Sequence, residues 1–161
     1  MKRKVSLLTA LVLVLTALLV PVMANAAEPV KIDAIAPLTG SLATYGESTT
    51  NGIKLAIEEI NAKGGVLGGR PLEVIDYMDD KGDSTEGANA FNKLVSDGAK
   101  AIIGSVTSGV TAGLATLANS EGMLLLTATA TADTVTDGTT TVFRACFRDS
   151  YQGEVGAKIA V

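Results

Sequence analysis

The chain has 161 residues, of which 13 are basic and 17 acidic, and it contains one cysteine and neither histidine nor tryptophan. Its net charge of −4, without a basic stripe, argues against nucleic-acid binding, which rests on neutralising phosphates. The lack of histidine excludes Ser-His-Asp and Cys-His catalysis and histidine-bound metals. A single cysteine forms neither an intrachain disulfide nor a thiolate zinc site.

Residues 1–26 have the pattern of a cleavable secretory signal peptide. Basic residues 2–4 precede a nearly continuous apolar run from Val5 to Val20, and Ala24-Asn25-Ala26 supplies the small-x-small cleavage pattern. The run is shorter than the roughly 20 residues that span a bilayer, although an uncleaved membrane anchor is the alternative. No cysteine near the cleavage point is available for lipid attachment. We therefore predict export to the periplasm and a soluble mature domain of residues 27–161.

Beyond residue 26, strand and helix patterns alternate along the chain. Strands are predicted where branched apolar runs end at turn residues, and helices where apolar residues recur at helical spacing. The predicted strands are 30–36, 72–78, 101–104, 123–127 and 142–144, and the predicted helices are 48–62, 84–96, 108–119 and one that begins near residue 150. The alternation predicts an α/β fold in which an open parallel sheet has helices on both faces.

Three loops follow predicted strands at the sheet edge where a ligand is expected. Open parallel sheets bind ligands beyond the carboxyl ends of their strands, where loops lead into helix N-termini. Residues 37–47, 105–111 and 127–133 form these loops, which are rich in hydroxyl groups and carry no basic residue. Because a helix N-terminus attracts anions through its unpaired N–H groups and its dipole, the loops suit a carboxylate.

Individual side chains in these loops admit two interpretations each. Ser108 stands where a helix begins, so it either contacts a ligand or only caps its own helix. Thr127, Thr129 and Thr131 alternate along the chain, which fits a binding loop and a continued strand equally well. Tyr45, in a glycine-flanked loop, is either an aromatic wall of the site or a surface residue.

Other motifs are weaker indications of function. The glycine-rich segment 64–69 follows a helix rather than a strand, so it lacks the context of a dinucleotide-binding loop. Asp79, Asp80 and Asp83 suit a calcium ion or a solvated turn, and their irregular spacing favours the turn. Cys146 is expected to be a small buried residue at the end of the fifth strand.

Several stretches, in the same order, resemble the branched-chain amino-acid binding proteins of ABC importers. They cover nearly all of the mature chain and comprise APLTGSLATYG at 36–46, INAKGG at 60–65, the aspartates at 79–80, AIIG at 101–104 before Thr107 and Ser108, and the Phe-Arg pair at 143–144 before Asp149. The family has two α/β lobes joined by a hinge, and this chain resembles the N-terminal lobe, without the second. The resemblance implies a periplasmic binding protein that delivers an amino acid to an inner-membrane permease.

The resemblance also implies roles for single residues. Ser108 and Thr131 match positions that hold the α-carboxylate and α-ammonium of the ligand, and Thr129 matches one whose carbonyl meets the ammonium. Tyr45 matches a residue that walls the ligand side chain, while Thr107 adjoins the site. The sequence departs from the family at Ala128, where proline is frequent, and at Gly82 and Thr107, which stand where some members have a cysteine pair.

These observations lead us to expect a binding protein rather than an enzyme, which needs neither a cofactor nor a metal and is monomeric when full length. The second lobe of the family supplies much of the pocket for the ligand's side chain. The identity of the ligand therefore stays open among leucine, another apolar amino acid, an amide and an aromatic acid. A ligand-sensing domain of a receptor or regulator with the same fold is the alternative. An exported hydrolase would need a pair of inward carboxylates, and the three loops offer only Glu47 and Asp133.

Overall fold

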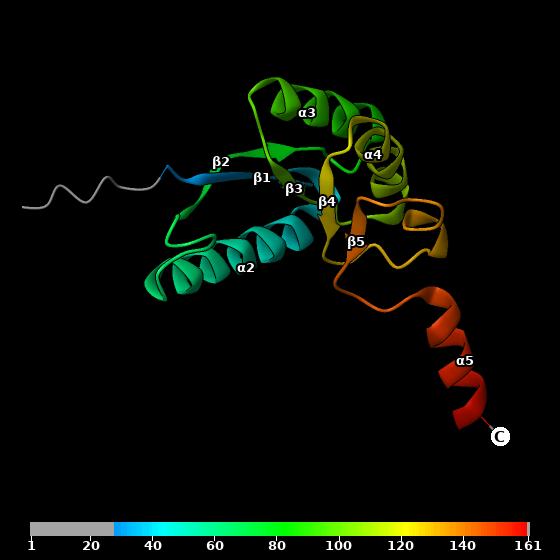
Figure 1. Cartoon of the computed structure of the whole chain (residues 1–161). Helices are drawn as coiled ribbons and strands as arrows, with labels where there is room; N and C mark the ends of the chain where they lie inside the picture. Colours follow the sequence, from blue (N-terminus) through cyan, green and yellow to red (C-terminus); the bar gives the residue numbers. More distant parts are fainter. Residues whose placement is uncertain (1–27, 161) are drawn as a thin grey trace, which may run out of the picture.

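A computed structural model describes residues 28–160, so the predicted signal peptide at 1–26 lies outside the described residues. The described chain forms a five-stranded parallel sheet with the order β2-β1-β3-β4-β5 (Figure 1). Its strands are β1 (Val30–Ala36), β2 (Leu72–Asp79), β3 (Ala101–Ile103), β4 (Leu124–Thr127) and β5 (Val142–Arg144). All five predicted strands are confirmed to within one residue at each end.

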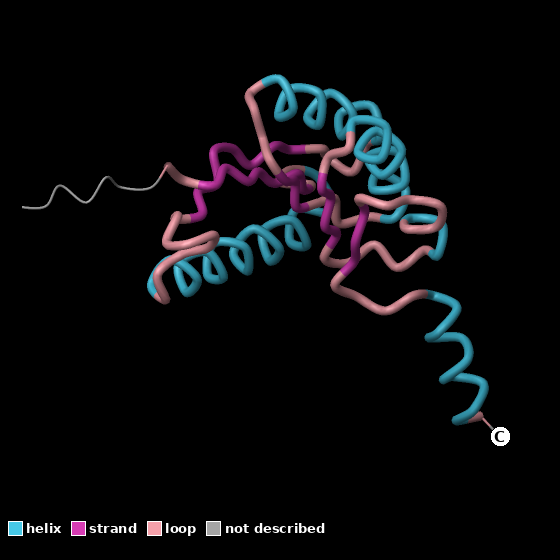
Figure 2. The backbone as a smooth tube through the Cα atoms, viewed as in Figure 1, coloured by secondary structure: helices cyan, strands magenta, loops and turns pink. Residues whose placement is uncertain are grey.

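Helices lie on both faces of this sheet, as the alternating pattern predicts. The helices are α2 (Ala43–Ala62), α3 (Ser84–Ser96), α4 (Ser108–Glu121) and α5 (Asp149–Ile159), with short 3₁₀ turns η1 (Gly40–Leu42) and η2 (Asp133–Val135). Helices α3 and α4 pack together on one face, α2 lies against the other, and α5 projects away from the sheet (Figures 1 and 2). The main core lies beneath α3 and α4, where Phe91, Leu94, Ile102, Leu114 and Leu125 are fully or almost fully buried.

Helix ends follow local sequence signals in two clear cases. Asp83 caps α3, because its carboxylate accepts the N–H groups of Thr85 at 2.8 Å and Glu86 at 3.0 Å. Gly122 ends α4 in the left-handed conformation with φ 65°, which glycine adopts without steric cost. The predicted bounds of α3 are therefore confirmed at both ends, and α4 runs two residues beyond its prediction.

The start of α2 differs from the prediction. The helix begins at Ala43 rather than at residue 48, so Tyr45 lies in its first turn and not in a loop. Gly46 explains the difference, because a Cβ atom there would lie 2.0 Å from the carbonyl oxygen of Pro37. This glycine allows the helix to approach the chain that leaves β1, whereas in sequence it resembles a helix breaker.

The face of the sheet that carries α2 is only partly covered by the described residues. Between this helix and the strands lies an apolar groove of about 440 Å³, whose sheet side includes Ile32, Ile103 and Leu126. Because it offers little polar surface, the groove suits hydrocarbon rather than a charged ligand. The polar loops at the carboxyl edge of the sheet are therefore the better candidate for a site.

Candidate functional site

Hydrogen bonds join the loop after β3 to the loop after β4. The hydroxyl of Thr127 donates to the carbonyl of Ser105 at 2.7 Å, and that of Thr129 donates to the carbonyl of Val106 at 2.6 Å. Further along, the N–H of Ala132 donates to Oγ of Ser108 at 3.2 Å. These bonds hold the residues around Ser108 next to those around Thr131, as the edge rule for parallel sheets predicts.

Ser108 does not cap its own helix. It is the first residue of α4, and the N-cap is Thr107, which has an extended backbone and whose side chain makes no capping hydrogen bond. The first N–H groups of a helix have no intrahelical acceptor, and no acidic residue lies in this first turn. The N-terminus of α4 therefore presents amide donors and the positive end of its dipole beside the Ser108 hydroxyl, an arrangement that binds anions.

The other predicted site residues take different positions. Thr129 is exposed and Thr131 half-buried, and both lie in a loop, because β4 ends at Thr127; their interpretation as a continued strand is wrong. Thr107 is half-buried next to Ser108. Tyr45 leaves 63% of its surface exposed and comes from α2 rather than from the two joined loops. None of these side chains is sealed in the interior.

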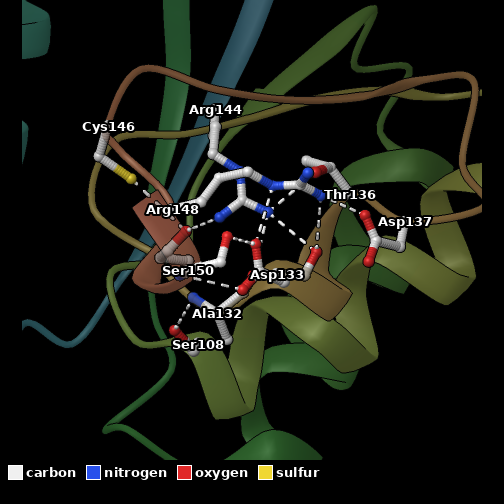
Figure 3. Close-up of polar contacts among 10 residues, drawn as sticks. Ser108, Ala132, Asp133, Thr136, Asp137, Arg144, Cys146, Arg148 and Ser150 are labelled. Carbon is white, nitrogen blue, oxygen red and sulfur yellow. Dashed lines mark hydrogen bonds and ion pairs between the residues drawn. The ribbon is translucent and has the colours of Figure 1, made fainter. Parts of the chain in front are cut away.

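Arg144, at the end of β5, shapes the loop after β4 (Figure 3). Its guanidinium donates to the carbonyls of Ala130 at 2.9 Å, Ala132 at 3.0 Å and Asp133 at 3.2 Å, and to the hydroxyl of Thr136 at 2.8 Å. A planar five-donor group suits several converging acceptors in a way that an ammonium does not. Sequence patterns predict no role for Arg144, although a cation at the end of the last strand, beside loops without basic residues, is a usable signal.

The same loop also holds the first turn of α5. The carbonyl of Thr131 accepts the N–H of Asp149 at 3.0 Å. The carboxylate of Asp133 accepts the N–H of Ser150 at 3.2 Å and its hydroxyl at 2.8 Å (Figure 3). The Ser150 hydroxyl, assisted by nearby Arg148, holds the pKa of Asp133 below its ordinary value. The loop with Thr129 and Thr131 thus caps α5 from outside the helix.

Two aspartates at the end of β2 fasten the remaining loops. Asp79 accepts the N–H of Leu38 at 2.7 Å and the hydroxyl of Thr39 at 2.5 Å, which ties down the loop after β1. Burial acts to raise the pKa of Asp79, but these bonds outweigh it and hold the pKa below its ordinary value. Asp80 is fully buried and accepts the Ser105 hydroxyl, which ties down the loop after β3.

The interpretation of this acidic segment as a solvated turn is therefore wrong for Asp80 and incomplete for Asp79. Within the described residues, no three side chains of the metal-binding types gather closely enough to hold an ion. Cys146 is half-buried rather than buried, because the chain turns outward after β5, and its thiol lies 3.5 Å from the carbonyl of Ala130 (Figure 3). No helix in the described part of the chain has the length and apolar character to cross a membrane.

Comparison with known proteins places this chain in a family. Residues 29–161 match the family model described as periplasmic binding protein. The chain belongs to this family. It is 45% identical over 130 residues to the Leu/Ile/Val-binding protein BraC3 of Rhizobium johnstonii, an alignment that covers 80% of this chain and 35% of that protein. It is 39% identical over 134 residues to the leucine-, isoleucine-, valine-, threonine-, and alanine-binding protein of Pseudomonas aeruginosa, covering 83% and 35% of the two chains.

Solved structures of the family share the fold. The branched-chain amino acid transporter substrate binding protein LivJ of Streptococcus pneumoniae, solved with isoleucine, has a TM-score of 0.71 and 36% identity, and 76% of this chain covers 35% of that one. The leucine binding protein LivK of Thermotoga maritima has a TM-score of 0.73 and 35% identity, with 81% and 36% covered. The resemblance and the fold class are thereby confirmed. The chain spans about a third of the length of these relatives.

Proposed function

We propose that the complete protein captures a branched-chain or related amino acid in the periplasm and delivers it to the membrane permease of an ABC importer. Residues 1–26 direct its export and are then removed. Residues 27–161 form the N-terminal lobe, and a second lobe completes the binding cleft. The relatives named for leucine, isoleucine and valine binding support this class of ligand.

The observation that carries this proposal is the free N-terminus of α4 beside two hydroxyl-bearing loops. The amides of the first turn and the Ser108 hydroxyl bind the ligand's carboxylate, since Oγ of Ser108 accepts a bond from Ala132 and keeps its own proton to donate. Thr131 and the carbonyl of Thr129 face the ammonium, while Thr107 adjoins the carboxylate. Tyr45 on α2 borders the ligand's side chain.

Binding proceeds without chemistry on the ligand. The amino acid docks on this lobe by its carboxylate, and the second lobe then closes over it about the hinge. Closure excludes water and so strengthens every polar contact inside the cleft. Of the two carboxylates in the three loops, Asp133 is engaged with Ser150, which leaves no acid–base pair for hydrolysis. The complete protein therefore acts as a monomeric carrier that uses no cofactor.

Calorimetry on the complete protein tests the proposal. The protein is unfolded and refolded to remove any retained ligand, and then titrated with leucine, isoleucine, valine and leucinol, which lacks the carboxylate. We expect the amino acids to bind and leucinol to bind roughly 100-fold more weakly, because several charge-assisted hydrogen bonds are lost. Equal binding of leucinol and leucine, or no binding of any amino acid, refutes the proposal.

A further inference from the structure

The pairing of β1 with β2 contains an irregularity in the middle of the sheet. Ile32 pairs with Val74, but Ala34 pairs with Tyr77, so two residues of β2, Ile75 and Asp76, lie opposite Asp33. Such bulges are rare between parallel strands, and an extra residue leaves backbone groups without their partners in the ladder. Something other than the backbone of β1 must therefore satisfy the N–H groups of the bulge.

The carboxylate of Asp33 accepts these N–H groups. One of its oxygens accepts both the N–H of Ile75 at 3.1 Å and the N–H of Asp76 at 2.8 Å. The side chain is buried, with 1% of its surface exposed, and its second oxygen has no hydrogen-bond partner among the described residues. Burial raises the pKa of Asp33. A carboxylate that is buried and half satisfied costs stability, so this one does more than fill space.

The bulge also decides which face each later residue of β2 points to. Val74 pairs with Ile32 and Tyr77 pairs with Ala34, and because Ile32 and Ala34 are two residues apart they share a face of the sheet, so Val74 and Tyr77 share that face as well. On this face the Lys54 ammonium of α2 lies 5.2 Å from the centre of the Tyr77 ring. Residues three apart share a face only because one extra residue lies between them, since side chains otherwise alternate. If the pairing of Ile32 with Val74 continued without a bulge, Tyr77 would point to the opposite face.

The change of register reaches the end of the strand. With the bulge, Asp79 pairs with Ala36. Without it, the residue before Asp79 would take this place, and both terminal aspartates would move by about 3.3 Å along the strand and change faces. In the observed register, Asp79 fastens the loop after β1 and Asp80 fastens the loop after β3 that leads to Ser108. The ligand site therefore depends on a register set inside the sheet.

We propose that Asp33 is a positioning residue for the ligand site: its carboxylate selects the bulged register of β2 and thereby places Asp79 and Asp80 where they hold the two loops. The role is indirect, because Asp33 lies three residues before the end of β1 and acts through the register. The part of the proposal that concerns ligand affinity rests on the proposed function.

Three variants of the complete protein test it. Asp33→Val removes the acceptor. Asp33→Val combined with deletion of Ile75 also removes the extra residue, so that Ile32–Val74 and Ala34–Tyr77 remain paired without a bulge. Asp33→Asn keeps an oxygen in place and is the matched control. Cross-strand contacts by NMR report the register, and leucine titration of the folded protein reports the site.

We expect Asp33→Val to lose the Ala34–Tyr77 contact and to bind leucine at least roughly tenfold more weakly, while the other two variants stay within about threefold of the parent protein. If Asp33 only stabilised the fold, deleting Ile75 from the Asp33→Val variant would not restore leucine affinity. Unchanged register or affinity in folded Asp33→Val overturns the proposal. Failure of the deletion variant to fold or to bind leucine also overturns the proposal. This variant has a regular strand pair in the observed register, so the proposal requires it to fold and to bind. If the parent protein binds no amino acid, the proposed function fails, and the register measurement alone decides about Asp33.

Discussion

Replacement of Arg144 by methionine should loosen the loop that carries Thr129 and Thr131. The guanidinium makes three bonds to carbonyls and one to a hydroxyl, and it is half-buried. A hydrogen bond from a charged donor contributes about 1.5–3 kcal/mol when it is well shielded, but water can replace part of each bond here. We therefore expect Arg144→Met to lower the free energy of unfolding by about 2–4 kcal/mol, and Arg144→Lys, which cannot satisfy all four acceptors, by about half of this.

Urea unfolding and leucine titration of the complete protein measure the two effects. Arg70→Met is the control, because Arg70 also donates to two carbonyls, those of Glu28 at 2.7 Å and Pro29 at 3.2 Å. These carbonyls lie just before β1, at the edge of the sheet opposite to the candidate site. The control should lose about 1 kcal/mol and keep its leucine affinity. A loss of less than 1 kcal/mol in Arg144→Met, or an equal loss of affinity in both variants, refutes the role that we assign to Arg144.

Three further predictions concern the site and its supports. Ser108→Ala should weaken leucine binding at least roughly tenfold in calorimetry, while Ser120→Ala at the far end of the same helix should not. Gly46→Ala should destabilise the fold by about 1–3 kcal/mol in urea, because its Cβ would overlap a backbone oxygen, whereas Gly52→Ala, which meets nothing within 4 Å, should stabilise it by up to about 1 kcal/mol. Burial acts to raise the pKa of Asp79, but hydrogen bonding outweighs it and holds the pKa below 3.8. The contribution of this carboxylate to stability is therefore present above pH 3.8 and is lost as the pH falls further. In urea unfolding at a series of acidic pH values, Asp79→Asn should lose less stability than the parent protein as the pH falls.

Much of the fold follows from local sequence signals. The branched apolar run at 30–36 becomes β1, and the capping aspartate and helical spacing at 83–96 give α3 its observed bounds. The three chain segments at the ligand edge were also predictable, since the alternation of strand and helix fixes which segments follow the carboxyl ends of the strands, although the first of them is helical from Ala43 onward. Within these loops, the meeting of Ser108 with the residues beside Thr131 follows from topology rather than from any property of the two side chains.

The parts that could not be predicted depend on contacts between distant residues. Gly46 resembles a helix breaker until its approach to Pro37 is known. Arg144 ends an ordinary short strand, and its partners lie 8 to 14 residues earlier in the chain. Asp33 stands in a run that predicts an unbroken buried strand, while the N–H groups that it accepts lie 42 and 43 residues away. No local pattern records such pairings, because the polar partner and the irregularity that it satisfies belong to different strands.

Three of the residues that sequence reasoning missed or misread share one physical role. Asp33 sets the register of β2, Asp80 attaches the β3–α4 loop to that strand, and Arg144 fixes the loop after β4. Each uses a polar or charged side chain to satisfy backbone or hydroxyl groups that the sheet and helices leave open. Ligand recognition by amides and hydroxyls demands donors held to within about 0.5 Å. A lobe that grips its ligand with neutral groups on loops therefore needs buried and half-buried charges behind those loops, and their removal should reduce affinity even though none of them is assigned a contact with the ligand.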